Sequence, residues 1–388
     1  MMVTKELKRA CIITPTYPDK FFIERGAFVE YLVRIWIEMG MHVDVVAPRS
    51  IPNIIRSITR SKQSDVSFAG NKITYPSYLS VSNKKLGFLD LESISRKQFL
   101  KASKRALKKV EIPDFYYGKF LMRGGKAAMD AGKQTNRPAF VDIGEHLLLD
   151  ELSKNDFCEA KKIIQAMDGI ACVSDQLASE VIHLGAHPDK VFVYPNTADI
   201  KRFRPMDQQY CRRRLGLPLN VPIIIFVGHF IERKGPLRVL SSLNNPRLRN
   251  VKGIFIGRGS QKPIGHNVLH EGPVLNRDLP LWLNAADLFV LPTQNEGHCN
   301  AINEAMACGL PIISSDIPEI REQVSEESGI LVNPNYQVQL VEAISKLIED
   351  STLRERLGKN GAQIQKQRSS INRASEILQW IKNLMNAK

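Results

Sequence analysis

The sequence lacks any hydrophobic run long enough to cross a membrane as a helix. Its longest strongly apolar run, residues 221–227, falls far short of the ~20 residues that a bilayer requires. No signal peptide is visible, because Lys5, Lys8 and Arg9 are followed by a strand-like segment and not by the longer apolar stretch of a signal peptide. We therefore expect a cytoplasmic protein.

Cysteine is scarce, and this excludes a disulfide framework. The chain has six cysteines without a C-x-x-C pair, most of them in segments typical of core strands or helices: Cys11, Cys158, Cys172, Cys211, Cys299 and Cys308. We expect them to be reduced packing residues. Since no Cys or His cluster has the spacing of metal ligands, we predict no metal and no other cofactor.

The glycine fingerprint of dinucleotide-binding proteins is missing as well. Gly257-Arg258-Gly259 is followed by Lys262 where the third glycine would stand, and residues 14–17, after the first expected strand, contain no glycine. These absences weigh against a dinucleotide-dependent oxidoreductase, which remains one alternative for a chain with parallel sheets.

The composition is that of an ordinary globular protein, with 43% hydrophobic and 24% charged residues. A chain of 388 residues exceeds what one hydrophobic core usually supports, so two domains are expected. Apolar β-branched segments alternate with amphipathic helical ones in both halves. This alternation predicts an α/β protein with two Rossmann-like, doubly wound domains.

The element pattern also gives domain limits. In the first half we expect strands at 10–14, 42–47, 139–143, 169–173 and 191–194 and a helix at 27–39, while residues 49–110 form the least regular part. In the second half the expected strands are 222–227, 251–256, 268–270, 288–291 and 311–314. A proline-marked connector ends at Pro205. The predicted domains are therefore residues 1–205 and 206–370, with a final helix at 371–388 packing back on the first.

The most informative segment is residues 287–316, which reads as strand, polar loop, short helix and strand. In an open parallel sheet, ligands bind at the carboxyl ends of strands, so a ligand is expected at the loop 293–300. The amides of a helix that begins near Asn300 can form a phosphate-binding site. Glu296 and Glu304 lie on either side of that site in the sequence, and their carboxylates can accept hydrogen bonds from the hydroxyl pairs of sugars. Alone, such a pair also fits a solvated loop and helix surface.

This segment resembles the signature of family 4 glycosyltransferases: a glutamate, seven intervening residues, and a second glutamate followed by Ala-Met-Ala-x-Gly-x-Pro. Here Glu296 and Glu304 are followed by Ala-Met-Ala-Cys-Gly-Leu-Pro at 305–311. Residues 226–235 look like the pyrophosphate loop of the family, and residues 256–260 and 270–274 like the strands beside its base pocket. The resemblance covers about residues 169–334.

The resemblance implies a GT-B fold, in which two Rossmann-like domains face a central cleft, and sugar transfer with retention of configuration. By this resemblance, Glu304 holds the ribose of a nucleotide-sugar. Glu296 holds donor-sugar hydroxyls and steadies positive charge at the anomeric carbon. Lys234, with Arg233, neutralises the departing pyrophosphate; a preorganised cation there stabilises the transition state more than the ground state.

Further substrate-binding residues are expected around these groups. In the C-terminal half they are Gly228, His229, Gly297, His298 and Asn300. His229 stands where the family usually has arginine, so phosphate binding would depend more on Lys234, Arg233 and the helix amides. From the N-terminal half, Gly26 is expected at the first helix, and His146, after a strand, is expected to reach the donor sugar or the acceptor. His146 also fits a purely structural histidine.

The net charge of +14 is concentrated in one stretch. Residues 51–110 hold 13 Lys or Arg against three acidic residues, with aromatic residues among them. Such a stretch suits the inner face of an anionic membrane, and equally a solvated helix and loop surface. A membrane contact would suit a glycan or lipid-linked saccharide acceptor in the assembly of a surface polysaccharide. The donor is expected to be a UDP-sugar, while the sequence itself does not separate a uridine from a guanosine carrier.

Two other function classes stay open. A catalytically silent nucleotide-sugar-binding scaffold would keep the fold without turnover, but the intact glutamate pair and Lys234 argue against it. A nucleic-acid-binding protein is supported only by the basic charge, and no recognisable binding motif accompanies that charge. We therefore expect no nucleic-acid partner.

Overall fold

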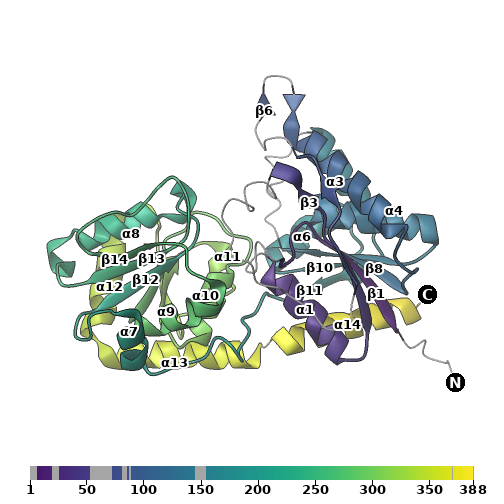
Figure 1. Ribbon diagram of the computed structural model, residues 1–388. Coiled ribbons are helices and arrows are strands. Elements are labelled where there is room, and N and C mark those ends of the chain that lie inside the picture. Colours follow the sequence, from purple (N-terminus) through teal and green to yellow (C-terminus); the bar gives the residue numbers. More distant parts are fainter. Residues whose placement is uncertain are drawn as a thin grey trace. The chain divides into compact units, whose positions relative to one another are not determined.

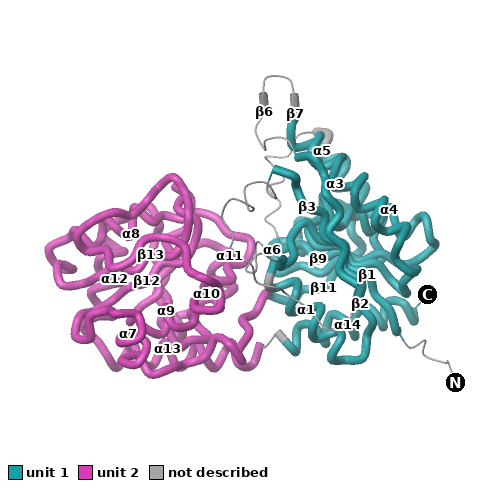
Figure 2. Tube along the Cα trace, viewed as in Figure 1, with its two compact units in different colours: residues 1–195, 371–388 teal, residues 196–370 magenta. Residues whose placement is uncertain are grey.

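The computed structural model describes residues 7–19, 26–52, 72–80, 85–86, 89–144, 154–368 and 370–387. The chain divides into two compact units, residues 1–195 with 371–388 (unit 1) and residues 196–370 (unit 2), coloured separately in Figure 2. Thus the chain passes from one unit to the other twice. Residues 371–388, expected to return to the first domain, belong to unit 1.

The change of unit falls after Pro195 rather than after Pro205, where the sequence placed it. The physical reason is packing. Ala198 and Phe203 are buried in the hydrophobic core of unit 2, and the carbonyl of Asn196 accepts a hydrogen bond of 2.7 Å from Asn303 of the same unit. The connector is therefore structurally part of unit 2.

Unit 1 is built on a seven-stranded parallel sheet with the order β11-β10-β9-β8-β1-β2-β4. Its strands are β1 (Arg9–Ile13), β2 (His42–Val46), β4 (Ile73–Thr74), β8 (Phe115–Lys119), β9 (Ala139–Ile143), β10 (Gly169–Cys172) and β11 (Val191–Val193). The helices are α1 (Ala27–Glu38), α3 (Leu91–Leu107), α4 (Lys126–Thr135), α5 (Lys154–Ala166), α6 (Asp175–His183) and α14 (Ser370–Asn386). Two small sheets pair β3 (Arg49–Ser50) with β5 (Ser77–Tyr78) and β6 (Lys85–Leu86) with β7 (Leu89–Asp90).

Alternating side chains of β1 show how the sheet of unit 1 is covered on both faces. Ala10 and Ile12 belong to the core cluster that includes α1 and α14. Cys11 and Ile13 belong to the other cluster, with α4, α5 and α6. The yellow helix α14 therefore closes one face of a sheet whose strands come from the first half of the chain (Figure 1).

Unit 2 holds a six-stranded parallel sheet with the order β14-β13-β12-β15-β16-β17. Its strands are β12 (Ile223–Val227), β13 (Lys252–Ile256), β14 (Val268–Gly272), β15 (Leu288–Leu291), β16 (Ile312–Ser315) and β17 (Gly329–Val332). The helices are α7 (Gln208–Leu215), α8 (Pro236–Leu243), α9 (Leu279–Ala285), α10 (Asn300–Ala307), α11 (Pro318–Arg321), α12 (Gln337–Glu349) and α13 (Ser351–Gln367).

The strand order of unit 2 fixes where a ligand belongs. Counted along the chain, the strands lie in the order 3-2-1-4-5-6, which is the Rossmann order. The order reverses between β12 and β15, which pair directly. In such sheets ligands bind outside the carboxyl ends of the strands at this switch point. The loops that leave β12 and β15 are therefore the ones to examine.

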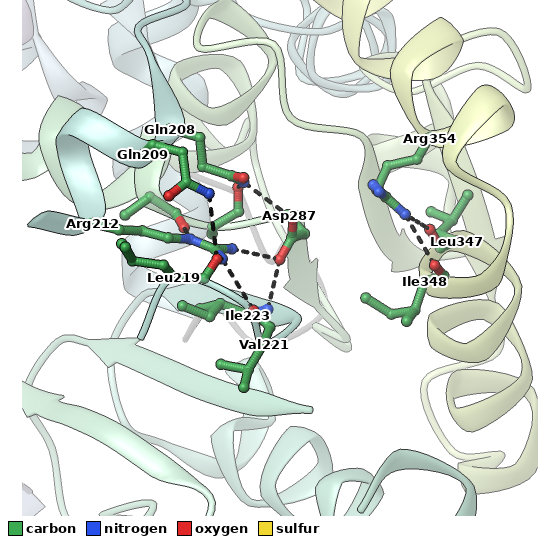
Figure 3. A network of polar contacts seen from close by, with 12 residues as sticks. Gln208, Gln209, Arg212, Leu219, Val221, Ile223, Asp287, Leu347, Ile348 and Arg354 are labelled. Atoms are coloured by element: carbon green, nitrogen blue, oxygen red, sulfur yellow. Dashed lines mark hydrogen bonds and ion pairs between the residues drawn. The ribbon is translucent and has the colours of Figure 1, made fainter. Parts of the chain in front are cut away.

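A buried arginine anchors the opposite end of these two strands (Figure 3). The Arg212 guanidinium, on α7, donates to Asp287 (2.8 Å) and to the carbonyls of Ala285 (2.8 Å), Leu219 (2.8 Å) and Val221 (3.1 Å). The Asp287 carboxylate also accepts from the amide of Ile223 at 2.7 Å. Because one network ties α7 to the starts of β12 and β15, the two strands are held in register below the switch point.

One helix was not located from the sequence, and one further prediction is wrong. Within residues 49–110, expected to be the least regular part, residues 91–107 form α3. Among its six buried residues only Phe99 is a large apolar one, the others being Ser95, Arg96, Ala102, Ser103 and Ala106, so no apolar stripe marks the helix. Cys158, expected to be a packing residue, is exposed on α5, whereas the other five cysteines are buried. No helix among the described residues is long and apolar enough to span a membrane.

Candidate functional site

The loop after β12 carries two cations to the switch point. After Gly228 and the exposed His229, the fully buried Phe230 turns the chain back toward the sheet, and its amide donates to the carbonyl of Arg258 at 2.8 Å. A short 3-10 turn, η4 (Glu232–Lys234), follows. Residue 235 then takes a positive φ of 76°, which glycine adopts without strain, and α8 begins.

The loop after β15 meets these cations through Glu296. Lys234 Nζ donates to Glu296 Oε1, and the Thr293 hydroxyl donates to the same oxygen at 2.9 Å. Arg233 lies 3.8 Å from Glu296 Oε1 and donates to the carbonyl of Asn295. The Glu296 residue is only 6% exposed. A buried carboxylate with a hydroxyl and two cations is thus assembled from two loops far apart in sequence.

The cluster pairs groups of opposite charge. An ion pair satisfies Glu296 and Lys234 in the free protein, as buried charges require. A ligand that carries both phosphate and sugar hydroxyls can replace each partner, with phosphate on the ammonium and hydroxyls on the carboxylate. The Thr293 hydroxyl would hold the carboxylate in place during this exchange.

Helix α10 starts at Asn300 and places Glu304 one turn further on. Its N-cap residue, Cys299, makes no side-chain cap, and the amides of the first turn carry the partial positive charge that favours an anion. Glu304 is partly buried. Burial raises the pKa of the Glu304 carboxyl to about 7, against the opposing effect of the positive Arg202. Its charge is therefore sensitive to pH in the neutral range.

Only some of the predicted site residues contact one another in the structure. Arg233, Lys234 and Glu296 come together, whereas no contact joins Glu304 to them among the described residues. Gly228, Gly297 and Asn300 are partly buried beside these loops, and His298 is buried. Gly26 lies in unit 1 with a φ of 76°, where a Cβ would lie 2.6 Å from the carbonyl oxygen of Thr16. His146 lies outside the described residues.

Sequence reasoning missed several residues of the site. Thr293, the hydroxyl partner of Glu296, stands three positions before it, at the end of a strand, and that position was a usable signal. Gln323 and Asn303 contact His298 from other elements, and no local pattern marks them. Among the residues that the structure describes, no group of three acidic, histidine or cysteine side chains could hold a metal ion.

Residues 207–364 match the family model described as "Glycosyl transferases group 1". TuaC of Bacillus subtilis (strain 168), whose name assigns it to teichuronic acid biosynthesis as a glycosyltransferase, is 26% identical over 349 residues, or 86% of this chain and 87% of that protein. The chain spans about half the length of the D-inositol 3-phosphate glycosyltransferases that it also matches.

Solved structures share the fold over nearly the whole chain. Sucrose-phosphate synthase from Thermosynechococcus elongatus has a TM-score of 0.79 at 20% identity and covers 98% of this chain and 100% of its own. Anabaena Alr3699/HepE in complex with UDP-glucose has a TM-score of 0.69 at 18% identity and covers 97% and 99%. The two Rossmann-like domains therefore form a GT-B fold, as the sequence predicted.

Proposed function

Because residues 207–364 form a glycosyltransferase group 1 domain, we propose that the protein transfers a hexose-type sugar, with retention of configuration, from a nucleotide-sugar to a glycan or lipid-linked saccharide. A UDP-sugar is the first candidate donor, since HepE, with the same fold, was solved with UDP-glucose. Surface-polysaccharide synthesis is the proposed setting, since TuaC is named for teichuronic acid biosynthesis.

One observation carries this proposal: the Arg233, Lys234 and Glu296 cluster lies at the switch point of the unit 2 sheet. Two cations and a buried carboxylate match a ligand with a diphosphate next to a sugar. Charge builds on the leaving diphosphate in the transition state, and fixed cations stabilise it there. Glu296 in turn would hold donor-sugar hydroxyls and favour positive charge at the anomeric carbon.

The proposed reaction needs no covalent nucleophile from the protein. The bond between the anomeric carbon and the leaving phosphate oxygen breaks, and the acceptor oxygen bonds to the same face of that carbon. The leaving phosphate takes the acceptor proton, while Glu296 and a backbone carbonyl stabilise the oxocarbenium-like centre. The nearby thiol of Cys299 is unsuited to attack, because burial, with the negative Glu296, raises its pKa to about 11.

The proposed roles of the other predicted residues follow this scheme. Gly228, His229, Gly297, His298 and Asn300 would line the donor site. His146, in the N-terminal domain, would reach the donor sugar or the acceptor, and Gly26 would be a further substrate-binding residue. No metal or cofactor enters the scheme.

The experiment that tests the function is a screen of UDP-, GDP- and ADP-sugars for donor hydrolysis and for binding by calorimetry. We expect one nucleotide-sugar to bind and to be hydrolysed slowly without an acceptor. Absence of binding to every donor would refute the proposal. Binding without hydrolysis or transfer to any saccharide acceptor would instead support the silent scaffold.

The Glu304 carboxyl gives this function a pH signature. Its raised pKa means that it gains a proton as pH falls through about 7, and a protonated carboxyl loses acceptor capacity for the ribose hydroxyls. We expect the Kd for UDP-glucose, measured by calorimetry, to rise about tenfold between pH 8 and pH 6. Glu304→Gln should bind more weakly at pH 8 and show a flatter profile; an unchanged pH profile in this variant would remove Glu304 from the site.

A basic face of unit 1 is the proposed membrane contact. A cavity of about 630 Å³ lies where α3 and α4 end and β8 begins, at the amino edge of the sheet. Apolar and basic side chains line it, including Leu107, Val110, Ile112, Lys101, Lys104, Lys108 and Lys133. Lysines at the carboxyl ends of helices also interact favourably with the helix dipole. Four lysines around apolar side chains, however, are suited to bind the headgroups of an anionic bilayer. Part of the basic stretch, residues 53–71, 81–84 and 87–88, lies outside the described residues.

Flotation with phosphatidylglycerol vesicles tests this contact. Each basic residue near an anionic surface contributes ~1 kcal/mol, so neutralising Lys101, Lys104 and Lys108 with glutamine should lower the partition coefficient about 100-fold at low salt. The exposed lysines of unit 2 at 346, 359 and 366 provide a control triple. A specific membrane face would attach the protein to the inner side of the cytoplasmic membrane. Wild-type protein that does not bind the vesicles, or an equal loss of vesicle binding in both triple variants, would contradict it.

A further inference from the structure

A buried amide lies directly beneath the donor loop. Gln323 follows α11 and is 4% exposed. Its side chain contacts both backbone groups of Cys299 and the ring of His298, in the segment between Glu296 and α10. No sequence motif marks Gln323, and the proposed reaction does not use it.

The hydrogen bonds fix the orientation of this amide. The backbone N–H of Cys299 can only donate, and it donates to Gln323 Oε1 at 2.9 Å. The Gln323 Nε2 group therefore points the other way, where it donates to the carbonyl of Cys299 at 3.2 Å. The same Nε2 lies 2.8 Å from His298 Nδ1. Consequently an N–H of Gln323 faces that ring nitrogen.

A second amide presents the same polarity. Asn303 Nδ2 donates to the carbonyl of Asn196 at 2.7 Å, and Asn303 Oδ1 accepts from Gln365 Nε2 at 3.0 Å. These partners fix which end of Asn303 carries nitrogen. Its Nδ2 lies 3.4 Å from His298 Nδ1. Two N–H donors thus converge on one ring nitrogen, and a proton on Nδ1 would oppose both of them.

We propose that Gln323, supported by Asn303, is a positioning residue that holds His298 neutral, with its proton on Nε2, and fixes the backbone of the donor loop at Cys299. His298 is only 8% exposed, so solvent cannot easily replace the amide contacts. The His298 ring would then add no third positive charge to those of Arg233 and Lys234 in the two donor-site loops. This consequence for donor binding rests on the proposed function, whereas the tautomer does not.

The chain offers informative variants of Gln323. In Gln323→Glu the oxygen that accepts from Cys299 remains, but a carboxylate oxygen replaces the amide nitrogen that faces His298. A carboxylate requires a proton on Nδ1 and favours the charged ring. Gln339 is the matched control, because its Oε1 also accepts from a backbone amide, that of Asn333 at 2.9 Å, while the residue is exposed.

Nitrogen-15 NMR of histidine-labelled full-length protein reads the tautomer directly. The signal of His298 is identified by its loss in His298→Gln. In wild type we expect an unprotonated Nδ1 and a protonated Nε2, and in Gln323→Glu a protonated Nδ1; Gln339→Glu should match wild type. A protonated Nδ1 in the wild-type protein, or a ring unaffected by Gln323→Glu, would overturn the assignment. The wild-type spectrum decides the tautomer even if Gln323→Glu fails to fold.

Calorimetry with UDP-glucose and UDP tests the positioning role separately. We expect Gln323→Glu to weaken binding about tenfold, the loss of roughly one hydrogen bond, and Gln339→Glu to leave it unchanged. Binding unaffected by Gln323→Glu would remove the positioning role. If wild type binds neither probe while the NMR shows the expected tautomer, the fault lies with the proposed donor rather than with the role of Gln323 toward His298.

Discussion

Replacing Lys234 by alanine is expected to lower kcat about 10²–10³-fold, the loss that follows removal of one preorganised group from the charge developed in a transition state. Lys234 is the better shielded cation of the pair, at 14% side-chain exposure against 44% for Arg233. A shielded charge acts on the leaving diphosphate with less screening by solvent. The fold should survive, because the Thr293 hydroxyl and Arg233 still contact the buried Glu296 carboxylate.

Steady-state kinetics with the donor found in the screen measure this effect. Lys262→Ala is the control, because Lys262 also lies near a glutamate of unit 2, 3.8 Å from Glu271, but is 59% exposed. Circular dichroism should show both variants folded. Near-normal turnover in Lys234→Ala would contradict the assigned role, and equal losses in both variants would indicate a nonspecific charge effect.

Deleting residues 371–388 is expected to unfold unit 1 and leave unit 2 folded. The deletion removes the apolar side chains of Ile377, Leu378 and Ile381, which are at most 2% exposed. Each such side chain contributes about 1.5–3 kcal/mol on burial. The free energy of unfolding of a whole domain is typically about 5–15 kcal/mol, so the loss of all three side chains is enough to unfold unit 1.

The same deletion removes Arg373, whose loss adds to the effect. Burial alone would raise the pKa of Asp142, but the charges of Arg373 and Lys119 hold it at about 2. Arg373 lies 3.1 Å from the fully buried carboxylate of Asp142. Removing one partner of a buried charge cluster typically costs about 3–5 kcal/mol.

Urea denaturation and limited proteolysis measure the outcome. The full chain should show protection in both units, and the truncated chain should retain protection only within residues 196–370. Lys382→Ala, a single change on α14 that leaves the buried side chains in place, is the control. Protection of residues 7–195 in the truncated chain would show that α14 is dispensable for unit 1.

Most strands of the two main sheets were predictable because each is an apolar run with clear ends. Residues 139–143 and 288–291 coincide with β9 and β15, and the other predicted strands differ at their ends by a residue or two, whereas β8 and β17 were not predicted. Helix α3 was not apparent, since small and polar residues fill its buried positions. The hydrophobic pattern of a sequence indicates which positions are buried only where those positions are occupied by apolar residues.

The candidate site was predictable to a similar extent. Glu296 and Lys234 were identified through a motif and a loop, and the structure joins them across two strands that pair in space. Their direct ion pair could not be foreseen, because it depends on the strand order. Gln323 illustrates the limit: its polarity depends on the amide of Cys299, a tertiary contact without a sequence signature.

Unit 1 is built from two separate parts of the chain, residues 1–195 and 371–388, and this affects the order in which the two units can fold during synthesis. Residues 196–370 are contiguous and can fold as soon as they have left the ribosome. The sheet of unit 1 is translated before unit 2, yet the helix that covers one of its faces is translated after unit 2. Trp36 and Phe140, which contact Ala374 and Trp380, therefore lack this cover until α14 has emerged. Unit 2 can thus fold before unit 1 is complete, and this face of the nascent chain is where we expect a chaperone to be needed.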